Sequence, residues 1–549
     1  MPLPRLTIAD GTRPGPVAMR ADVPLFVGMV RRAAAPLPVG VAQWLAGSDY
    51  AKRGPLLRDA TAQDTLLDIA VPIDSFAGFE ALFAWRERPL EPGSPVMIPT
   101  RLGLAVRQFF QEGGARCWVV RVGDPLPLLA EGDGDAAQAH DPEDIAAWRR
   151  HLDWVDALPP ADAAKRVPLL PGLVARARAA DPQRPESWHG AGQIFAVEEA
   201  AFLCLPDLPD LIAGPSRRLP DHESPAYGAE QFIDCAPELP GSDPLPAPTR
   251  MAYVAPRLDL VGYRAWGDAL RHMLTMMDGR NSAAHRRDVI LAAALPLPDL
   301  DDPAMPAQAQ LWPLELDIPG HAGLGEGLFS DGLAASGRVM LAYPWLAGDD
   351  TALQPEGSAG GEGALLGMLA RSTLTRGAHR AAPGRVLAAA RECLPALPAH
   401  ILKRSPADGP YRWLGDLLCL FAVERGQLRL LSDVTTARSD AWREGGTARL
   451  MGAVLRQAAL VGQELTFAPN GPESWVRVRQ QMEALLDRFY LGGAFAGGNR
   501  DHAFQVRCDR TTMLQSDIDG GRIIAEVSFR PARALQHIHV SLALQGEAA

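Results

Sequence analysis

Residues 102–122 read LGLAVRQFFQEGGARCWVVRV and contain three structural signals in a row. The apolar side chains of 102–110 recur at helical spacing, which predicts a short amphipathic helix. Gly113 and Gly114 then stop the helix, because glycine readily adopts the left-handed conformation in which helices end. Residues 115–122 are mostly apolar and rich in valine, which predicts a buried strand. A helix, a glycine stop and a buried strand together indicate an α/β fold.

The same alternation of strands and helices continues on both sides of this block. Residues 75–83 predict a helix with Ser75 as its cap, since a serine hydroxyl accepts a bond from the first backbone amides. Further helices are predicted at 260–277, 363–371 and 447–461, and strands at 23–30, 67–73, 193–205, 288–295, 336–345, 417–423 and 428–431. We therefore expect an α/β fold of mixed α+β type.

Residues 474–549 predict one helix followed by three strands. The helix covers 474–490 and the first strand covers 503–509. In the other two strands, apolar residues alternate with polar ones, and the apolar positions are Ile523, Ala525, Val527, Phe529, Ile538, Val540 and Leu542. A strand so near a chain end has an edge that needs a partner, and we expect that another subunit supplies it.

Composition places the chain among soluble globular proteins. Its 549 residues predict roughly three or four domains, and 47% hydrophobic against 22% charged residues exclude a disordered chain. The net charge of −11, without a long basic cluster, argues against nucleic acid as a partner. The longest apolar run, near 290–297, is too short for a bilayer, and no signal peptide is expected at the N-terminus. We therefore expect no membrane partner and a cytoplasmic location.

The motifs predict no cofactor and no catalytic residue. The six cysteines are scattered without metal-ligand spacing, which favours buried free thiols. Glycines in 361–367 have the spacing of a loose dinucleotide loop, but no strand is predicted directly before them and Glu362 would repel a phosphate. We interpret this segment as a structural loop.

No metal site is predicted either. His537 and His539 share one side of a predicted strand but have no Cys, Asp or Glu nearby at ligand spacing, so they are interpreted as surface or interface residues. Asp517 and Asp519 stand before two glycines but lack the closing glutamate of a calcium loop, so they indicate a turn stabilised by aspartate.

The motifs as an ordered set resemble those of contractile tail sheath proteins. The most specific match is the block at 104–122. Further matching segments follow the family order along nearly the whole chain: 26–28, 76–83, 343–345, 357–363, 370–383, 467–470, Trp475, 493–497, 503–504 and 506–509. One block alone would be suggestive, whereas the ordered set is specific.

This resemblance implies a function. Sheath subunits of phage tails, tailocins and injection systems form stacked hexameric rings around an inner tube, and their contraction drives the tube through a target envelope. The implied partners are further copies of the chain, the inner tube protein, and baseplate and tail-terminator proteins. The family has a middle domain of subtilisin-like topology without protease activity, so no enzyme is expected. Subunits of this kind assemble in the cytoplasm and become part of a phage tail or phage tail-like particle.

The resemblance also implies a division of the chain. We expect an N-terminal arm at 1–22, the N-terminal part of the sheath core at 23–125, a middle domain at 126–395, a C-terminal sheath core domain at 396–530 and a C-terminal arm at 531–549. Arms of this family complete shared β-sheets in neighbouring subunits. The candidate arm residues are Leu6, Ile8, Ile523, Ala525, Val527, Phe529, Ile538, Val540 and Leu542.

Three features depart from the family pattern, and one of them is a longer glycine loop that carries Glu362. Residues 5–10 replace the usual opening of the N-terminal arm, and His379 stands where an aromatic residue is commoner. These departures favour a divergent or minor sheath paralogue as one alternative. A static tube or shell protein and an enzyme of the α/β class are the others.

Overall fold

A computed structural model of the chain describes most of its residues. The described ranges are 20–47, 66–129, 180–216, 253–279, 285–299, 336–397, 414–437, 440–464, 469–532 and 538–545. Within these ranges, no helix combines the length and the apolar character that crossing a membrane requires.

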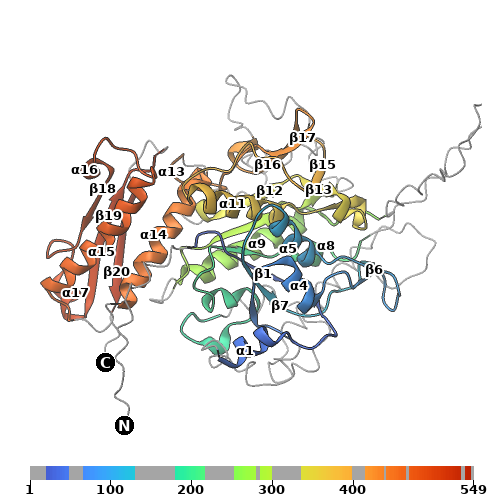
Figure 1. Ribbon diagram of the computed structural model, residues 1–549, viewed down its shortest axis with the longest axis horizontal. Coiled ribbons are helices and arrows are strands. Elements are labelled where there is room, and N and C mark those ends of the chain that lie inside the picture. Colours follow the sequence, from blue (N-terminus) through green and yellow to red (C-terminus); the bar gives the residue numbers. More distant parts are fainter. Residues whose placement is uncertain are drawn as a thin grey trace, which may run out of the picture.

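An eight-stranded sheet forms the centre of the molecule (Figure 1). Its order across the sheet is β17 (Gln427–Leu430), β16 (Cys419–Glu424), β12 (Val339–Tyr343), β10 (Ile290–Ala294), β8 (Phe202–Cys204), β1 (Pro24–Gly28), β7 (Cys117–Arg121) and β3 (Ala70–Ile73). The six strands from β16 to β7 run parallel, and the two edge strands β17 and β3 pair antiparallel. The four central strands β12, β10, β8 and β1 are buried along their whole length, as expected where helices cover both faces of a parallel sheet.

Two hydrophobic cores lie on the two faces of this sheet. Alternate residues of β1 separate them, since Leu25 and Val27 belong to one core and Phe26 to the other. Helices α8 (Leu208–Ala213) and α9 (Leu260–Asp278) supply the first core. Helices α4 (Phe76–Leu82), α5 (Arg101–Gln111) and α11 (Glu362–Arg376) supply the second.

The helix–glycine–strand block at 102–122 has the predicted structure. α5 ends at Gln111, Gly113 follows with a φ of +102°, and β7 begins at Cys117. The predicted cap of α4 is also confirmed, because Gly78 N donates to Ser75 Oγ at 3.1 Å. The strand predicted at 193–205 is shorter than expected: 190–195 form a 3-10 helix and only 202–204 pair in the sheet.

The glycine segment 361–367 begins helix α11 and packs it closely against α5. A Cβ atom on Gly363 would lie 2.1 Å from the carbonyl oxygen of Ala105, and one on Gly367 would lie 2.4 Å from that of Phe109. The structure does place a short strand, β14 (Ser358–Ala359), before this helix, but it pairs antiparallel in a separate small sheet. The glycines therefore serve helix packing.

Short elements complete this part of the molecule. β13 (Trp345–Gly348) lies between β14 and β15 (Ala390–Leu394) in a three-stranded sheet. Two-residue strands pair as β2 (Arg31–Arg32) with β4 (Phe83–Ala84), β5 (Arg88–Pro89) with β6 (Met97–Ile98), and β9 (Arg257–Leu258) with β11 (Leu297–Pro298). Helix α1 covers Val39–Gly47.

The last part of the chain forms a second unit, which we call the C-terminal unit (α14 to β20; at the left in Figure 1). It contains the sheet β18 (Phe504–Arg507), β19 (Arg522–Phe529) and β20 (Ile538–Gln545), with helices α14 (Gly445–Glu464) and α15 (Pro472–Leu491). Side chains of both helices and of the sheet form a third core. The short helices are α13 (Asp440–Arg443), α16 (Arg500–Ala503) and α17 (Gln515–Asp519).

The eight-stranded sheet draws its strands from three of the predicted segments of the chain. It combines strands from the segments 23–125, 126–395 and 396–530, so the predicted boundaries after 125 and after 395 fall within one sheet. The physical reason is that β16 and β17 return to extend the sheet beside β12 instead of joining the C-terminal unit.

Candidate functional site

The sheet of the C-terminal unit contains most of the residues predicted to link subunits. β19 is its central strand and pairs with β18 over four positions and with β20 over eight. β20 therefore occupies one backbone edge of β19 along its whole length, whereas β18 occupies the other edge only over Glu526–Phe529. The free edge of this sheet next to the predicted arm belongs to β20, because no strand lies beyond it among the described residues.

The four predicted residues of β19 lie in the core of the unit. Ile523, Ala525, Val527 and Phe529 are all buried, and they pack in one cluster with α15 residues such as Leu486. The alternation read from the sequence is confirmed, but these side chains contact their own chain. These four side chains are therefore not available on the surface of the subunit.

The predicted residues of β20 are placed by the backbone register. Ile538 stands opposite Phe529, Val540 opposite Val527, and Leu542 opposite Ala525. Leu6, Ile8 and His537 lie outside the described residues.

The opposite face of the sheet is polar. Arg507 Nη1 lies 3.8 Å from Glu526 Oε2 across the β18–β19 pair, and Arg522 Nη2 lies 2.6 Å from Asp517 Oδ1. Asp517 also accepts a bond from Leu514 N at 2.9 Å, so the predicted aspartate-stabilised turn exists as the first turn of α17.

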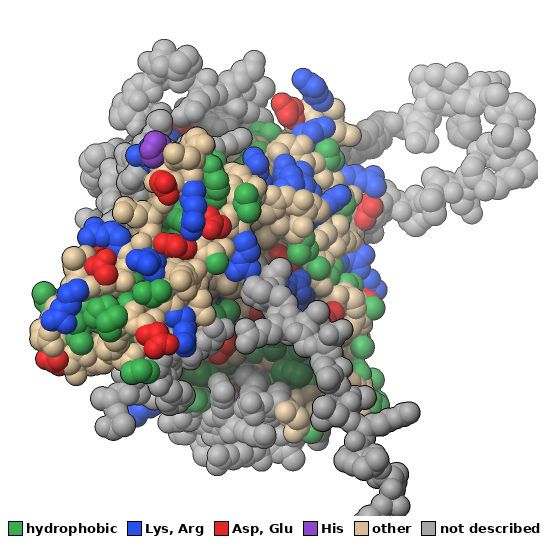
Figure 2. Space-filling model, turned by 60° about the vertical axis from the view of Figure 1, so that its left-hand side comes forward, with side chains coloured by type: hydrophobic (Ala, Val, Ile, Leu, Met, Phe, Trp, Pro, Cys, Tyr) green, Lys and Arg blue, Asp and Glu red, His purple; other side chains and the backbone are tan. Residues whose placement is uncertain are grey.

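Two of the most exposed hydrophobic side chains of the C-terminal unit lie next to its helices α15 and α17. Leu491 is 83% exposed at the end of α15, and Leu514 is 71% exposed before α17. Figure 2, which brings this side of the molecule forward, shows hydrophobic side chains between acidic and basic ones. Such mixed surfaces are typical of protein–protein contacts.

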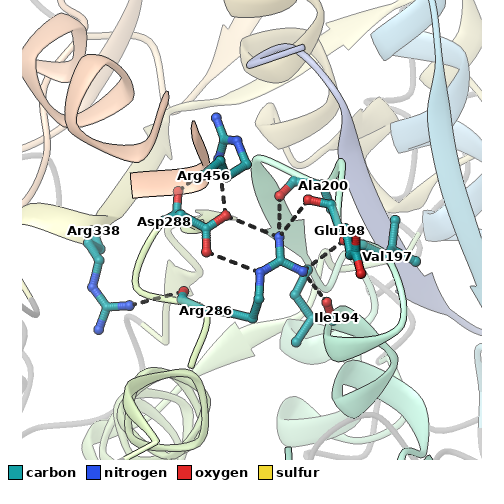
Figure 3. Close-up of polar contacts among 8 residues, drawn as sticks. All are labelled: Ile194, Val197, Glu198, Ala200, Arg286, Asp288, Arg338 and Arg456. Carbon is teal, nitrogen blue, oxygen red and sulfur yellow. Dashed lines mark hydrogen bonds and ion pairs between the residues drawn. The ribbon is translucent and has the colours of Figure 1, made fainter. Parts of the chain in front are cut away.

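A buried arginine cluster joins the C-terminal unit to the large sheet (Figure 3). Arg286, just before β10, donates to the carbonyl oxygens of Ile194, Val197 and Ala200, the last two at 2.8 and 2.7 Å. Its Nε and Nη2 each lie 3.1 Å from an oxygen of Asp288. Sequence reasoning missed this cluster, because its members come together only in the folded chain.

Asp288 is shared with the C-terminal unit. Arg456 on α14 donates from Nη1 to the Asp288 carbonyl oxygen at 3.0 Å and to its carboxylate at 3.3 Å. Burial acts to raise the pKa of Asp288, but the charges of Arg286 and Arg456 outweigh it and hold the pKa below its usual value. The ionised carboxylate therefore fixes α14 against the loop before β10.

A second buried charge cluster lies where the carboxyl ends of β1 and β8 meet. Asp210 accepts bonds from Arg88 Nη1 at 2.5 Å and from Arg101 Nε at 3.2 Å. Asp207 accepts from Met29 N at 2.7 Å, and Glu362 is buried at the start of α11. This end of a parallel sheet is where α/β enzymes bind ligands.

Burial is the main cause that raises the pKa of Asp207 to about 7, and the same holds for Glu362, whose pKa is also about 7. Asp210 differs, because its two arginine partners overcome the effect of burial and lower its pKa. Of the three carboxyls, Asp210 alone is in ion pairs here, and Glu362 Oε2 is buried without a hydrogen-bond partner among the described residues. Within the described ranges, no three His, Cys, Asp or Glu residues are grouped to hold a metal.

We compared the sequence and the structure of this chain with those of known proteins, and the structures alone gave a match. No protein-family model and no curated protein matches the sequence. The structure is similar to a chain in the contracted-state baseplate of the anti-feeding prophage (AFP), with a TM-score of 0.50 and 17% identity, covering 100% of this chain and 98% of that one. This likeness shows a shared fold along the whole chain.

Two sheath structures are also similar. The AFP helical sheath in its contracted state matches with a TM-score of 0.47 and 17% identity, over 95% of this chain and 93% of that chain. The PVC sheath complex of an extracellular contractile injection system, also contracted, matches with a TM-score of 0.48 and 13% identity, over 95% and 91%.

Proposed function

We propose that this chain is a structural sheath subunit of a contractile tail or injection machine. It polymerises as stacked hexameric rings around an inner tube, and the contraction of these rings drives the tube through a target envelope. The observation that carries the proposal is the fold shared, over the whole chain, with a protein of the AFP baseplate. The ordered sheath-like motifs support it independently. In this proposal, subunits assemble in the cytoplasm, and baseplate and tail-terminator proteins lie at the two ends of the assembly.

In this proposal, the edge of β20 receives a strand from a neighbouring subunit. Each ladder hydrogen bond contributes about 0.5–1.5 kcal/mol, so a short added strand is weak by itself. Repetition around and along the tube makes the array persistent. The N-terminal arm with Leu6 and Ile8 is the proposed source of the added strand, and Ile538, Val540 and Leu542 are the proposed receiving residues.

The proposal assigns the large sheet to the non-catalytic, subtilisin-like domain. Its parallel inner strands with helices on both faces support that assignment. Contraction needs no nucleotide in this scheme, because the extended array is metastable and a trigger at one end lets subunits move to a lower-energy packing.

A second candidate is a minor sheath paralogue located at one end of the particle. The observation that favours it is that the matched AFP structure is a baseplate. Labelling with gold-coupled antibodies separates the two candidates. The main sheath subunit is labelled along the shaft, whereas an end-located paralogue is labelled at one tip.

Electron microscopy of the chain, produced together with the products of its neighbouring genes, tests the proposal. We expect tubular particles in a long and a short form, with this chain in the outer layer of both. Particles of one fixed length would identify a static shell protein instead. If the chain instead stays a monomer, forms no particles and shows catalytic activity by itself, it is an enzyme.

A further inference from the structure

Four arginines gather on one surface of the large unit. We call the surface formed by Arg371, Arg376, Arg385 and Arg429 the arginine patch. The first two lie in the last turns of α11, Arg385 in the loop that follows, and Arg429 in β17. Backbone bonds connect these elements, since Gly384 N donates to Leu430 O at 2.7 Å.

The arginines of the patch bond only to neutral acceptors. Arg376 Nη2 donates to Ala381 O at 2.8 Å, Arg429 Nη1 to Gly384 O at 2.8 Å, and Arg385 Nη2 to a threonine hydroxyl at 3.4 Å. Within the described residues, no carboxylate lies within 4 Å of a patch guanidinium.

The positive charges of the patch therefore act on one another. Partial burial first, and then the charges of Arg376 and Arg371, lower the pKa of Arg385. The charge of Arg371 acts on Glu112, but that carboxyl is buried and accepts a bond from Ala388 N at 2.7 Å. Among the described residues, the buried Glu112 is therefore the one carboxyl on which a patch arginine is seen to act, and the exposed side of the patch has no ion pair.

Two exposed apolar residues lie within the patch. Leu374 on α11 is 51% exposed, and Val386 is 40% exposed and forms a backbone bridge with Arg429. Arginine together with apolar side chains, and without Asp or Glu, is the composition found in the centre of protein interfaces.

We infer that the arginine patch binds a carboxylate-rich surface on a second copy of this chain. The rest of the chain has the opposite net charge, since −11 becomes −11 − 4 = −15 when the four patch arginines are set aside. Two such patches repel each other, so the contact joins different surfaces of the two copies. Contacts of this kind generate rings or helices instead of closed two-fold dimers. The inference rests on the proposed self-assembly and adds the surface that mediates it.

Charge reversal of the patch provides the first test. The double variant Arg371→Glu/Arg385→Glu changes two side chains that hold little of the local structure. The matched control, Arg184→Glu/Arg477→Glu, reverses two exposed arginines that already face carboxylates. Both doubles change the net charge from −11 by −4, because each substitution contributes −2.

Sedimentation velocity of the full chain in low and in high salt gives the readout. We expect the patch variant to self-associate at least tenfold more weakly than the control in low salt, and the association of the unaltered chain to weaken as salt is raised. The patch variant loses the repulsion among these arginines but places a carboxylate at position 371 near the buried Glu112, so its melting curve is measured beside that of the parent to show that it is folded. Equal association of patch variant and control overturns the inference.

A photo-crosslinking amino acid at position 374 tests the partner without changing the patch charges. The expected product joins residue 374 to an acidic peptide of a second copy, outside the patch. A product that joins two patches, or one formed only with a different protein, overturns the inference. The proposed function is tested by a different result. Particles that lack long and short forms would contradict contraction, whether or not this crosslink forms.

Discussion

At the scale of single residues, Arg286 carries several contacts that no other side chain can replace. It forms an ion pair with Asp288 and donates hydrogen bonds to backbone carbonyl groups between residues 194 and 200. We predict that Arg286→Met lowers the free energy of unfolding by about 3–5 kcal/mol, because it leaves a buried carboxylate with half of its partners and several carbonyls without a donor. Urea unfolding of the full chain measures this change.

The neighbouring Arg287 is the matched control for that variant. It is half-exposed and lies 3.9 Å from Asp278, so Arg287→Met should change the stability by no more than about 0.5 kcal/mol. Equal effects of the two substitutions would show that the buried network does not stabilise the fold.

Asp207 and Glu362 predict a dependence of stability on pH. Their pKa values are about 7 in the folded chain, above the ordinary values of 3.8 and 4.5. At pH values between the ordinary pKa values and 7, the folded chain holds protons that the unfolded chain has released. The free energy of unfolding is therefore greatest near the lower pH limit and falls as the pH rises toward 7. At about 1.36 kcal/mol per pKa unit, we predict a loss of roughly 2.5 kcal/mol for each group between pH 5 and pH 8, and about 5 kcal/mol for both.

Glu362→Gln and Asp207→Asn identify the groups responsible. Each amide keeps the shape of the side chain but cannot ionise, so each variant should show a flatter stability curve over this pH range. Asp210 and Asp288 have lowered pKa values and titrate below this range. An unchanged slope in both variants would assign the pH dependence to other groups.

At the scale of elements, the contact between α5 and α11 depends on small residues. The backbone of α5 comes so close to Gly363 that a methyl group there would overlap the Ala105 carbonyl oxygen at 2.1 Å. Replacing glycine by alanine normally stabilises a helix by about 0.5–1 kcal/mol. We predict the opposite sign for Gly363→Ala, a loss of roughly 1–3 kcal/mol in urea unfolding, because the two helices must separate.

Gly40 in α1 provides the comparison for this helix contact. Nothing lies within 4 Å of the position that its Cβ would occupy, so Gly40→Ala should be neutral or stabilising. If both substitutions stabilise the protein, the two helices are not held together as closely as the structure indicates.

At the scale of the whole molecule, β20 is both the last strand of its own sheet and the proposed contact with a neighbour. Deleting 536–549 removes all eight register pairs between β19 and β20. We predict that this truncated chain remains soluble, because the cores of the large sheet do not include β20, but that it no longer forms particles. Negative-stain microscopy and sedimentation measure the two properties.

A shorter deletion serves as the control for the truncation. Removing only 546–549 keeps the whole of β20 and should leave assembly intact. Normal particles from the longer deletion would refute the role of this strand as a link between subunits.

Sequence patterns established the local structures of this chain. The block at 102–122, the cap at Ser75 and the alternation of Ile523 to Phe529 are decided within a few residues by hydrogen bonding and by the period of each element. The ordered motifs also indicated the fold that the AFP comparison shows.

The tertiary structure alone decided which elements meet. Alternation shows that one face of β19 is buried but not which chain covers it, and the structure places its own α15 there. The same reason applies to the large sheet, where β16 joins β12 through contacts that local patterns do not encode. The ion pair of Arg456 with Asp288 spans 168 residues, and its strength comes from burial that exists only after both units have folded.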